Sequence, residues 1–99
     1  MPNSKIIWDS KALEQFSKIV KYIAKDSLLQ AENVRTDIIK KIDSLANSPA
    51  MYAPDKYKEN NDGSYRAFEL HRLRIAYHVS GNEIRILRVR STYQEPLQY

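Results

Sequence analysis

The stretch SYRAFELHRLRIAYHVSGNEIRILRVR, residues 64–90, decides the fold of this chain. Between residues 73 and 79 apolar and polar side chains alternate with a period of two, which is typical of a strand with one buried face. Ser80-Gly81-Asn82 is a tight-turn signal. Residues 84–89 then predict a central strand, because they are apolar on both sides. With a further strand at residues 65–70, the stretch predicts three consecutive antiparallel strands.

The residues before this stretch show the period of α-helices. A first helix is predicted to begin at Asp9 or Ser10, whose side chain would cap the free N–H groups, and to end near Ala24. A capping box opens a second helix at Ser27, and this helix ends near Pro49. The apolar stripes of the two helices are Leu13, Phe16, Val20 and Ile23, widened by Ala12, Ile19 and Ala24, and then Ala31, Val34, Ile38, Ile42 and Leu45.

These elements combine into one predicted fold. Residues 5–8 form a short first strand, and the brief break between the helices implies an antiparallel helical hairpin. We therefore predict a single α+β domain over residues 1–99, with the hairpin packed on a curved, mainly antiparallel four-stranded sheet in the order β-α-α-β-β-β. Residues 49–63 are predicted to be a loop, and residues 91–99 an irregular cap.

Positive charge is concentrated in the strand region. The chain has a formal net charge of +4, and residues 64–90 carry six of its seven arginines against only Glu69 and Glu83. An arginine guanidinium is planar, permanently charged and able to bind phosphate or carboxylate through two parallel hydrogen bonds. The expected partners are therefore nucleic acid, an acidic protein or an acidic peptide.

Several classes of function are not expected. The chain has no cysteine, so it has neither disulfides nor thiolate chemistry. We see no metal-ligand spacing and no glycine-rich phosphate loop, and we expect no metal and no cofactor. No apolar run is long enough for a signal peptide or a membrane span, so we expect no membrane partner and a cytoplasmic location.

The alternation also predicts which side chains share a face. If Leu73, Ile75, Tyr77 and Val79 face the helices, then Arg72, Arg74 and His78 face the open side of the sheet. Arg66 falls on the same strand face as Phe68 and Leu70. Arg88 and Arg90 fall on the face of Ile84 and Ile86, and would extend past the end of the buried region. The candidate residues for binding an anionic partner or a target are Arg74, Arg88, Arg90 and Tyr93.

The order and spacing of several segments resemble the RelE/ParE superfamily, the toxins of bacterial type II toxin–antitoxin modules. The matching segments are Trp8 before the first helix, Ala31-x-x-Val34…Ile38…Ile42…Leu45…Pro49, Arg66-x-Phe68…Arg74-Ile75-x-Tyr77-x-Val79, residues 83–89 and Glu95-Pro96. The resemblance implies a cognate antitoxin as partner and a possible toxin–antitoxin hetero-oligomer. It leaves two branches, RelE-like enzymes that cut messenger RNA on the ribosome and ParE-like toxins that act against DNA gyrase.

The residues favour the ParE-like branch. For a ribosome-dependent endoribonuclease, the resemblance implies Arg66, Arg74 and Tyr99 as the catalytic set, with Tyr93 as a second choice for the tyrosine. Phe68, however, stands where that branch has a second lysine, and Ser91-Thr92 replaces its basic groups. We therefore expect action on DNA gyrase, with the ribonuclease acting on ribosome and mRNA as the alternative. A degenerate toxin that only binds antitoxin is a second alternative, and whether the chain is an enzyme stays open.

Overall fold

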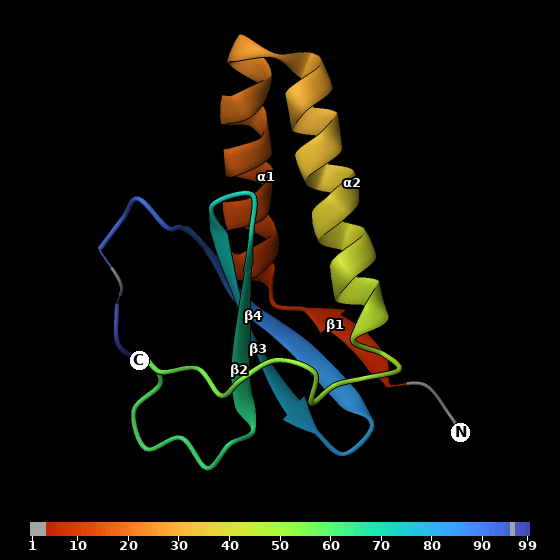
Figure 1. Cartoon of the computed structure of the whole chain (residues 1–99), viewed down its shortest axis with the longest axis vertical. Helices are drawn as coiled ribbons and strands as arrows, with labels where there is room; N and C mark the ends of the chain where they lie inside the picture. The colour runs from red at the N-terminus through yellow and green to blue at the C-terminus, as the bar shows by residue number, and fades with distance from the viewer. Residues whose placement is uncertain (1–3, 96) are drawn as a thin grey trace.

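The computed structural model describes residues 4–95 and 97–99 and contains two helices and four strands (Figure 1). The elements are β1 (Lys5–Trp8), α1 (Ser10–Asp26), α2 (Leu28–Ser44), β2 (Tyr65–Leu70), β3 (Leu73–Ser80) and β4 (Glu83–Ser91). This confirms the predicted fold class and the order β-α-α-β-β-β. Within the described part of the chain, no helix is long and apolar enough to cross a membrane. Pro96, part of the tail pattern, lies outside the described residues.

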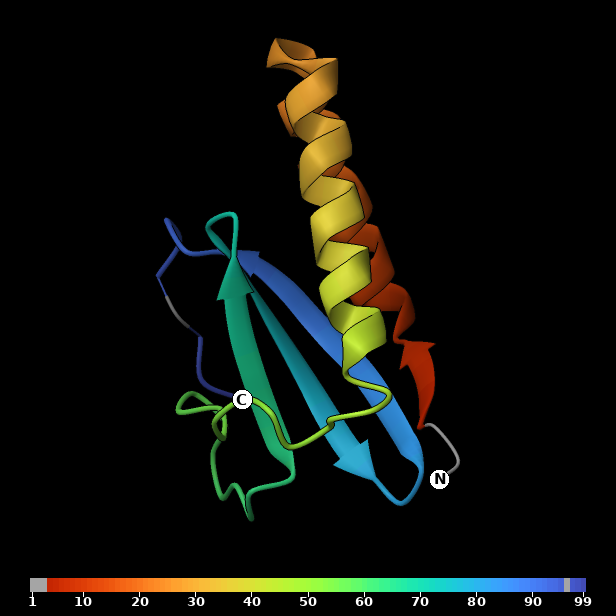
Figure 2. The same cartoon turned by 45° about the vertical axis from the view of Figure 1, so that its right-hand side comes forward.

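The sheet has the strand order β1-β4-β3-β2. β2, β3 and β4 are antiparallel neighbours, and β1 joins the edge of β4 in parallel. The helical hairpin lies on one face of this sheet and extends beyond it (Figures 1 and 2). The other face is the one on which the candidate site is built.

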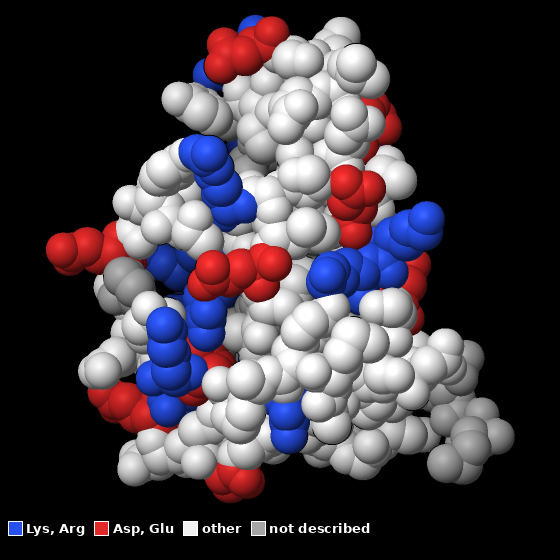
Figure 3. All heavy atoms as spheres, in the orientation of Figure 1, with Lys and Arg blue, Asp and Glu red and all other residues white. Residues whose placement is uncertain are grey.

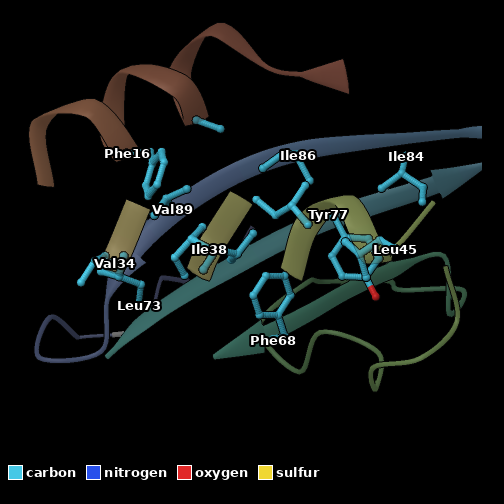
Figure 4. Close-up of a cluster of buried hydrophobic side chains, with 13 residues drawn as sticks. Phe16, Val34, Ile38, Leu45, Phe68, Leu73, Tyr77, Ile84, Ile86 and Val89 are labelled. Atoms are coloured by element: carbon cyan, nitrogen blue, oxygen red, sulfur yellow. The ribbon is translucent and has the colours of Figure 1, made fainter. Parts of the chain in front are cut away.

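The core lies between the hairpin and the sheet (Figure 4). From α2, Ile38 and Ile42 are almost fully buried, and from β3 Ile75 and Tyr77 meet them. Each such side chain contributes about 1.5–3 kcal/mol when it leaves water. All five residues of the predicted stripe on the second helix are buried, which confirms that stripe.

The two helix starts differ from each other. At α2 the Ser27 side chain accepts a hydrogen bond of 3.1 Å from the Gln30 backbone N–H, as the sequence predicted. At α1 the N-cap residue is Asp9, but its side chain makes no capping hydrogen bond, so that part of the prediction is wrong. The extended backbone of Asp9 continues from β1, and its N–H bonds instead to the carbonyl of Ile86 at 2.9 Å. Asp9 therefore joins strand to helix through its backbone.

A β-bulge in β4 corrects one sequence prediction. Ala76 pairs with Arg88 while its neighbour Tyr77 pairs with Ile86, so Leu87 is an extra residue on β4. An extra residue reverses the alternation of side chains beyond it. Val89 therefore joins Ile86 in the core, and Arg88 and Arg90 lie on the opposite face, not on the face of Ile84 and Ile86.

Candidate functional site

The sheet face opposite the helices is partly covered by a loop and by the C-terminal tail. The Asp55 N–H donates to the Tyr65 carbonyl at 2.8 Å, which holds the loop along the edge of β2. The tail is held against the loop, because the Tyr99 N–H donates to the Tyr57 carbonyl at 3.0 Å. Figure 1 shows the tail end beside this loop. Loop and tail together place polar side chains over the open face of β3 and β4.

Asp55 is the centre of this arrangement, and its side chain is fully buried. Its Oδ1 accepts a hydrogen bond from Arg74 Nη2 at 2.8 Å and another from the Tyr57 backbone N–H at 3.0 Å. Its Oδ2 accepts from the Tyr99 hydroxyl at 2.7 Å. The carboxylate is thus bound by three elements that lie far apart in the sequence, namely the loop, β3 and the tail.

The protonation states of this group are fixed by its contacts. Burial raises the pKa of Asp55, but the hydrogen bonds from Arg74, Tyr99 and Tyr57 outweigh burial and lower the pKa below its usual value of 3.8. Burial also raises the pKa of Tyr99, and the hydrogen bond to the Asp55 carboxylate raises it further. At neutral pH Asp55 is therefore ionised and Tyr99 is protonated. Neither group is poised to exchange a proton near neutral pH.

The positive charge of Arg74 is balanced by two carboxylates. Besides Asp55, it binds Glu69 Oε2 through Nη1 at 2.9 Å, and Glu69 is its direct partner across β2 and β3. The guanidinium carbon also lies 4.8 Å from the centre of the Tyr57 ring. Desolvation would lower the pKa of Arg74, but the hydrogen bonds to Asp55 and Glu69 raise it. Its charge is permanent and is compensated within the fold.

Arg88 and Arg90 have a different environment. Arg88 donates to the Leu97 carbonyl and lies with its guanidinium carbon 4.0 Å from the centre of the Tyr99 ring. Arg90 donates to the Glu95 backbone carbonyl at 3.1 Å. Burial lowers the pKa of Arg88, although an arginine stays charged in proteins. Among the described residues neither arginine has a carboxylate partner, so their charge is available to another molecule.

A small cavity of about 80 Å³ lies among these side chains, with Arg74, Arg88 and Arg90 in its wall. Thr92 and Gln94 of the tail also line it. On the face seen in Figure 3, basic and acidic atoms are interspersed and form no continuous basic patch. Within the described residues, no group of histidine, aspartate and glutamate side chains is arranged to hold a metal ion.

The structure separates some residues that the sequence analysis grouped. Arg74 and Tyr99 meet through Asp55, but Arg66 lies on the helix-facing side of the sheet. There Arg66 donates to the Tyr52 carbonyl, so the sheet stands between it and Arg74. Tyr93 is 72 % exposed and lies away from the cavity, with the Arg72 guanidinium 5.2 Å from its ring centre.

Sequence reasoning did not find Asp55. Hydrophobic periodicity places strands and helices, and it gives no information on which loop residue folds back over a sheet. One signal was available, because a cluster of arginines on a half-covered face needs acidic partners and the strands supply only Glu69 and Glu83. That signal points to an acidic residue from a loop. It does not say which one.

Comparison with known proteins agrees with this architecture. Residues 6–96 match the family described as the ParE toxin of the type II toxin–antitoxin system parDE. No match was found among the curated proteins.

Three solved structures share the fold. The chromosomal ParDE toxin–antitoxin system from P. aeruginosa is 21% identical, with a TM-score of 0.68 over 89% of this chain and 95% of that chain. The toxin–antitoxin complex RelBE2 from Mycobacterium tuberculosis is 14% identical, with a TM-score of 0.56 over 92% and 93% of the two chains. The YoeB dimer from Staphylococcus aureus is 20% identical, with a TM-score of 0.50 over 87% and 93%.

Proposed function

Because this chain belongs to the ParE toxin family of type II toxin–antitoxin systems, we propose that it inhibits growth by acting on DNA gyrase until a cognate antitoxin neutralises it. In this proposal the chain is not a nuclease. The observation that carries the proposal is the state of the tyrosine that the ribonuclease alternative would use, because the Tyr99 hydroxyl is committed to the ionised Asp55. The proposal implies that the protein works in the cytoplasm, where gyrase is found.

The chemistry of RNA cleavage explains why the state of the Tyr99 hydroxyl matters. Cleavage at a ribose 2′-OH needs a base to take a proton, a cation to stabilise the phosphate and an acid to protonate the leaving oxygen. Because its pKa is raised, Tyr99 stays protonated at neutral pH and is a poor proton donor. Because the pKa of Asp55 is lowered, its carboxylate is a weak base. Arg74 is already paired with two carboxylates, and Arg66 lies on the opposite face of the sheet. This arrangement supports a binding surface over a catalytic one.

We assign the binding role chiefly to Arg88 and Arg90. Among the described residues, their guanidinium groups donate hydrogen bonds only to carbonyl oxygens, and Arg88 also packs on an aromatic ring. An acidic group of the antitoxin or of the target would therefore meet uncompensated charge. Arg74 holds the loop and tail that shape this surface. Tyr93, which lies away from the cavity, is an exposed aromatic side chain suited to packing against a bound protein.

The test separates the two targets with one protein preparation. The purified protein is added to gyrase with relaxed plasmid, and separately to ribosomes carrying a defined message. We expect loss of supercoiling and an intact message. Arg90→Glu should weaken the effect on gyrase, whereas Arg85→Glu, an exposed arginine of the same strand that is already paired with Glu83, should not.

Other outcomes would contradict the proposal. Cleavage of the message with unchanged supercoiling would support the ribosome-dependent endoribonuclease. Normal growth on overexpression without antitoxin, with neither activity in vitro, would support a degenerate toxin that only binds antitoxin.

A further inference from the structure

A series of three hollows runs round the C-terminal end of β4, from the open face of the sheet to the face that α1 covers. The first is the cavity of about 80 Å³ that holds the arginines. The second, of about 260 Å³, shares Arg90 and Gln94 with the first. It shares Lys18 and Ile19 with the third, which has a volume of about 490 Å³ and extends to Tyr93 in the tail. Because neighbouring hollows have common walls, together they form one groove.

We propose that this groove binds a single strand of nucleic acid, with its arginines against the phosphates and its tyrosines stacked on the bases. The inference rests on the proposed function only for the source of the strand, which would be DNA held by gyrase. The groove itself does not depend on gyrase being the target. RNA offers the same chemistry, so the test includes an RNA strand.

Three arginines along the groove have no acidic partner among the described residues, namely Arg72, Arg88 and Arg90. Glu69 also lines the first hollow, but its carboxylate is paired with Arg74 at 2.9 Å. Each unit of a nucleic acid strand carries one phosphate, so arginines that are spread along a groove can each meet a separate charge. The groove therefore has an excess of positive charge that suits a polyanion.

Two tyrosines in the third hollow have exposed rings. Tyr22 of α1 is 70 % exposed, and Tyr93 of the tail is 72 % exposed. The guanidinium carbon of Arg72 lies 5.2 Å from the centre of the Tyr93 ring, so a cation stands beside that ring. Proteins that bind single strands combine a positively charged groove with aromatic side chains on which the bases stack. The third hollow has both components.

The turn that carries Arg72 is held from two sides. His71 Nε2 lies 2.7 Å from Asp37 Oδ2 on α2. The Arg72 carbonyl accepts hydrogen bonds from the Thr92 N–H at 2.8 Å and from the Thr92 hydroxyl at 3.1 Å. These contacts stabilise positive φ angles of 52° at His71 and 62° at Arg72, which residues other than glycine rarely adopt. A turn that is fixed before binding loses little freedom when a ligand arrives.

The combination of charge and aromatic rings favours nucleic acid over an acidic protein. One residue of a peptide offers either a carboxylate or an aromatic ring, whereas each nucleotide offers a phosphate and a base together. A double helix keeps its bases stacked on each other, and it would leave the rings of Tyr22 and Tyr93 without a partner. The groove therefore suits a single strand better than a duplex.

The salt dependence of binding counts the arginines in contact with phosphates. The purified chain is added to fluorescently labelled oligothymidylate of about twelve nucleotides, and binding is followed by anisotropy at several salt concentrations. Each phosphate neutralised on a single strand contributes about 0.7 to the log–log slope, so three arginines predict a slope of about −2. Arg72→Gln and Arg90→Gln should each make the slope shallower by about 0.7. Arg85→Gln is the control, because Arg85 is paired with Glu83 and lines none of the three hollows, and it should leave the slope unchanged.

A pair of variants at Tyr93 separates stacking from simple apolar contact. Tyr93→Leu removes the ring and should weaken binding of oligothymidylate by at least about fivefold. Tyr93→Phe keeps the ring and should bind within about twofold of the wild type. A duplex of the same length should bind more weakly than the single strand. Circular dichroism and thermal unfolding verify that all variants fold.

The outcomes distinguish the groove from the proposed target. Equal binding by Tyr93→Leu and Tyr93→Phe, or equally tight binding of a glutamate-rich peptide of the same charge, overturns the groove. Failure of both oligothymidylate and oligouridylate to bind also overturns it, while the supercoiling assay still decides on gyrase separately. Tighter binding of oligouridylate than of oligothymidylate supports the groove but makes RNA the source of the strand, and this argues against gyrase as the target.

Discussion

Replacing Asp55 with asparagine should remove a large part of the stability of this domain. The side chain keeps its shape but loses its charge, while Arg74, whose side chain is mostly buried, keeps only Glu69 as an acidic partner among the described residues. Removing one member of a buried ion pair costs about 3–5 kcal/mol, and the remaining partner places Asp55→Asn near the lower end, at about 3 kcal/mol. A natural domain has a total stability of about 5–15 kcal/mol, so the loss is substantial.

The measurement is urea unfolding at pH 7, followed by the fluorescence of the single tryptophan, Trp8, which packs on Phe16. In thermal unfolding of a chain of this length, the same loss of about 3 kcal/mol corresponds to an unfolding temperature lower by about 15 °C. Glu69→Gln is the control, because it removes the other partner of Arg74 from a position that is 54 % exposed. The control should cost less than about 1 kcal/mol.

The pH dependence gives an independent check with a definite sign. The pKa of Asp55 is lower in the folded chain than its usual value of 3.8, so the ionised group stabilises the fold above that pH. This stabilisation is lost as the pH falls through the lowered pKa. Wild-type and Asp55→Asn should therefore approach each other in stability as the pH falls below this lowered pKa. A difference under about 0.5 kcal/mol at pH 7, or one that does not depend on acid, would refute the reasoning.

Two further predictions concern the tail and the second helix. Tyr99→Phe keeps the ring beside Arg88 but removes the hydroxyl that binds Asp55. We expect the variant to lose about 1–2 kcal/mol of stability and to show faster hydrogen exchange at the backbone amide of position 99. Unchanged exchange would contradict the contact. Ser27→Ala removes the cap of α2 and should cost about 1 kcal/mol in urea unfolding, while Ser27→Gly should cost only a few tenths, so equal losses would argue against the capping bond.

The regular elements were predictable because their signals are local. The predicted strands at residues 5–8 and 65–70 match β1 and β2, and the buried stripe of α2 was identified from its spacing alone. Burial of one face imposes a period of two or of 3.6, and this leaves a direct trace in the sequence. The same logic fails for Leu13, because an apolar residue at the right spacing is not obliged to be covered by its own chain.

The site was less predictable because it depends on contacts between distant segments. Asp55 is 19 residues from Arg74 and 44 from Tyr99, and no periodicity links them. The position of Arg88 and Arg90 depends on a single extra residue in β4. Since Leu87 is apolar and the bulge contains no glycine, the sequence Ile86-Leu87-Arg88-Val89 fits a regular strand as well as a bulged one.

The bulge explains why the arginines gather where they do. In a regular strand Arg88 would continue the face of Ile86 and point at the helices, which would bury a charge against Phe16 and its neighbours. The bulge keeps Val89 in the core and turns Arg88 to the open face, opposite the small side chain of Ala76. Beyond Trp8 the short β1 leaves the edge of β4 unpaired, and there Gln15 accepts the Val89 N–H at 2.8 Å. Helix α1 therefore stabilises the bulge. We expect that loss of the bulge would separate the arginines of the cluster before the domain unfolds.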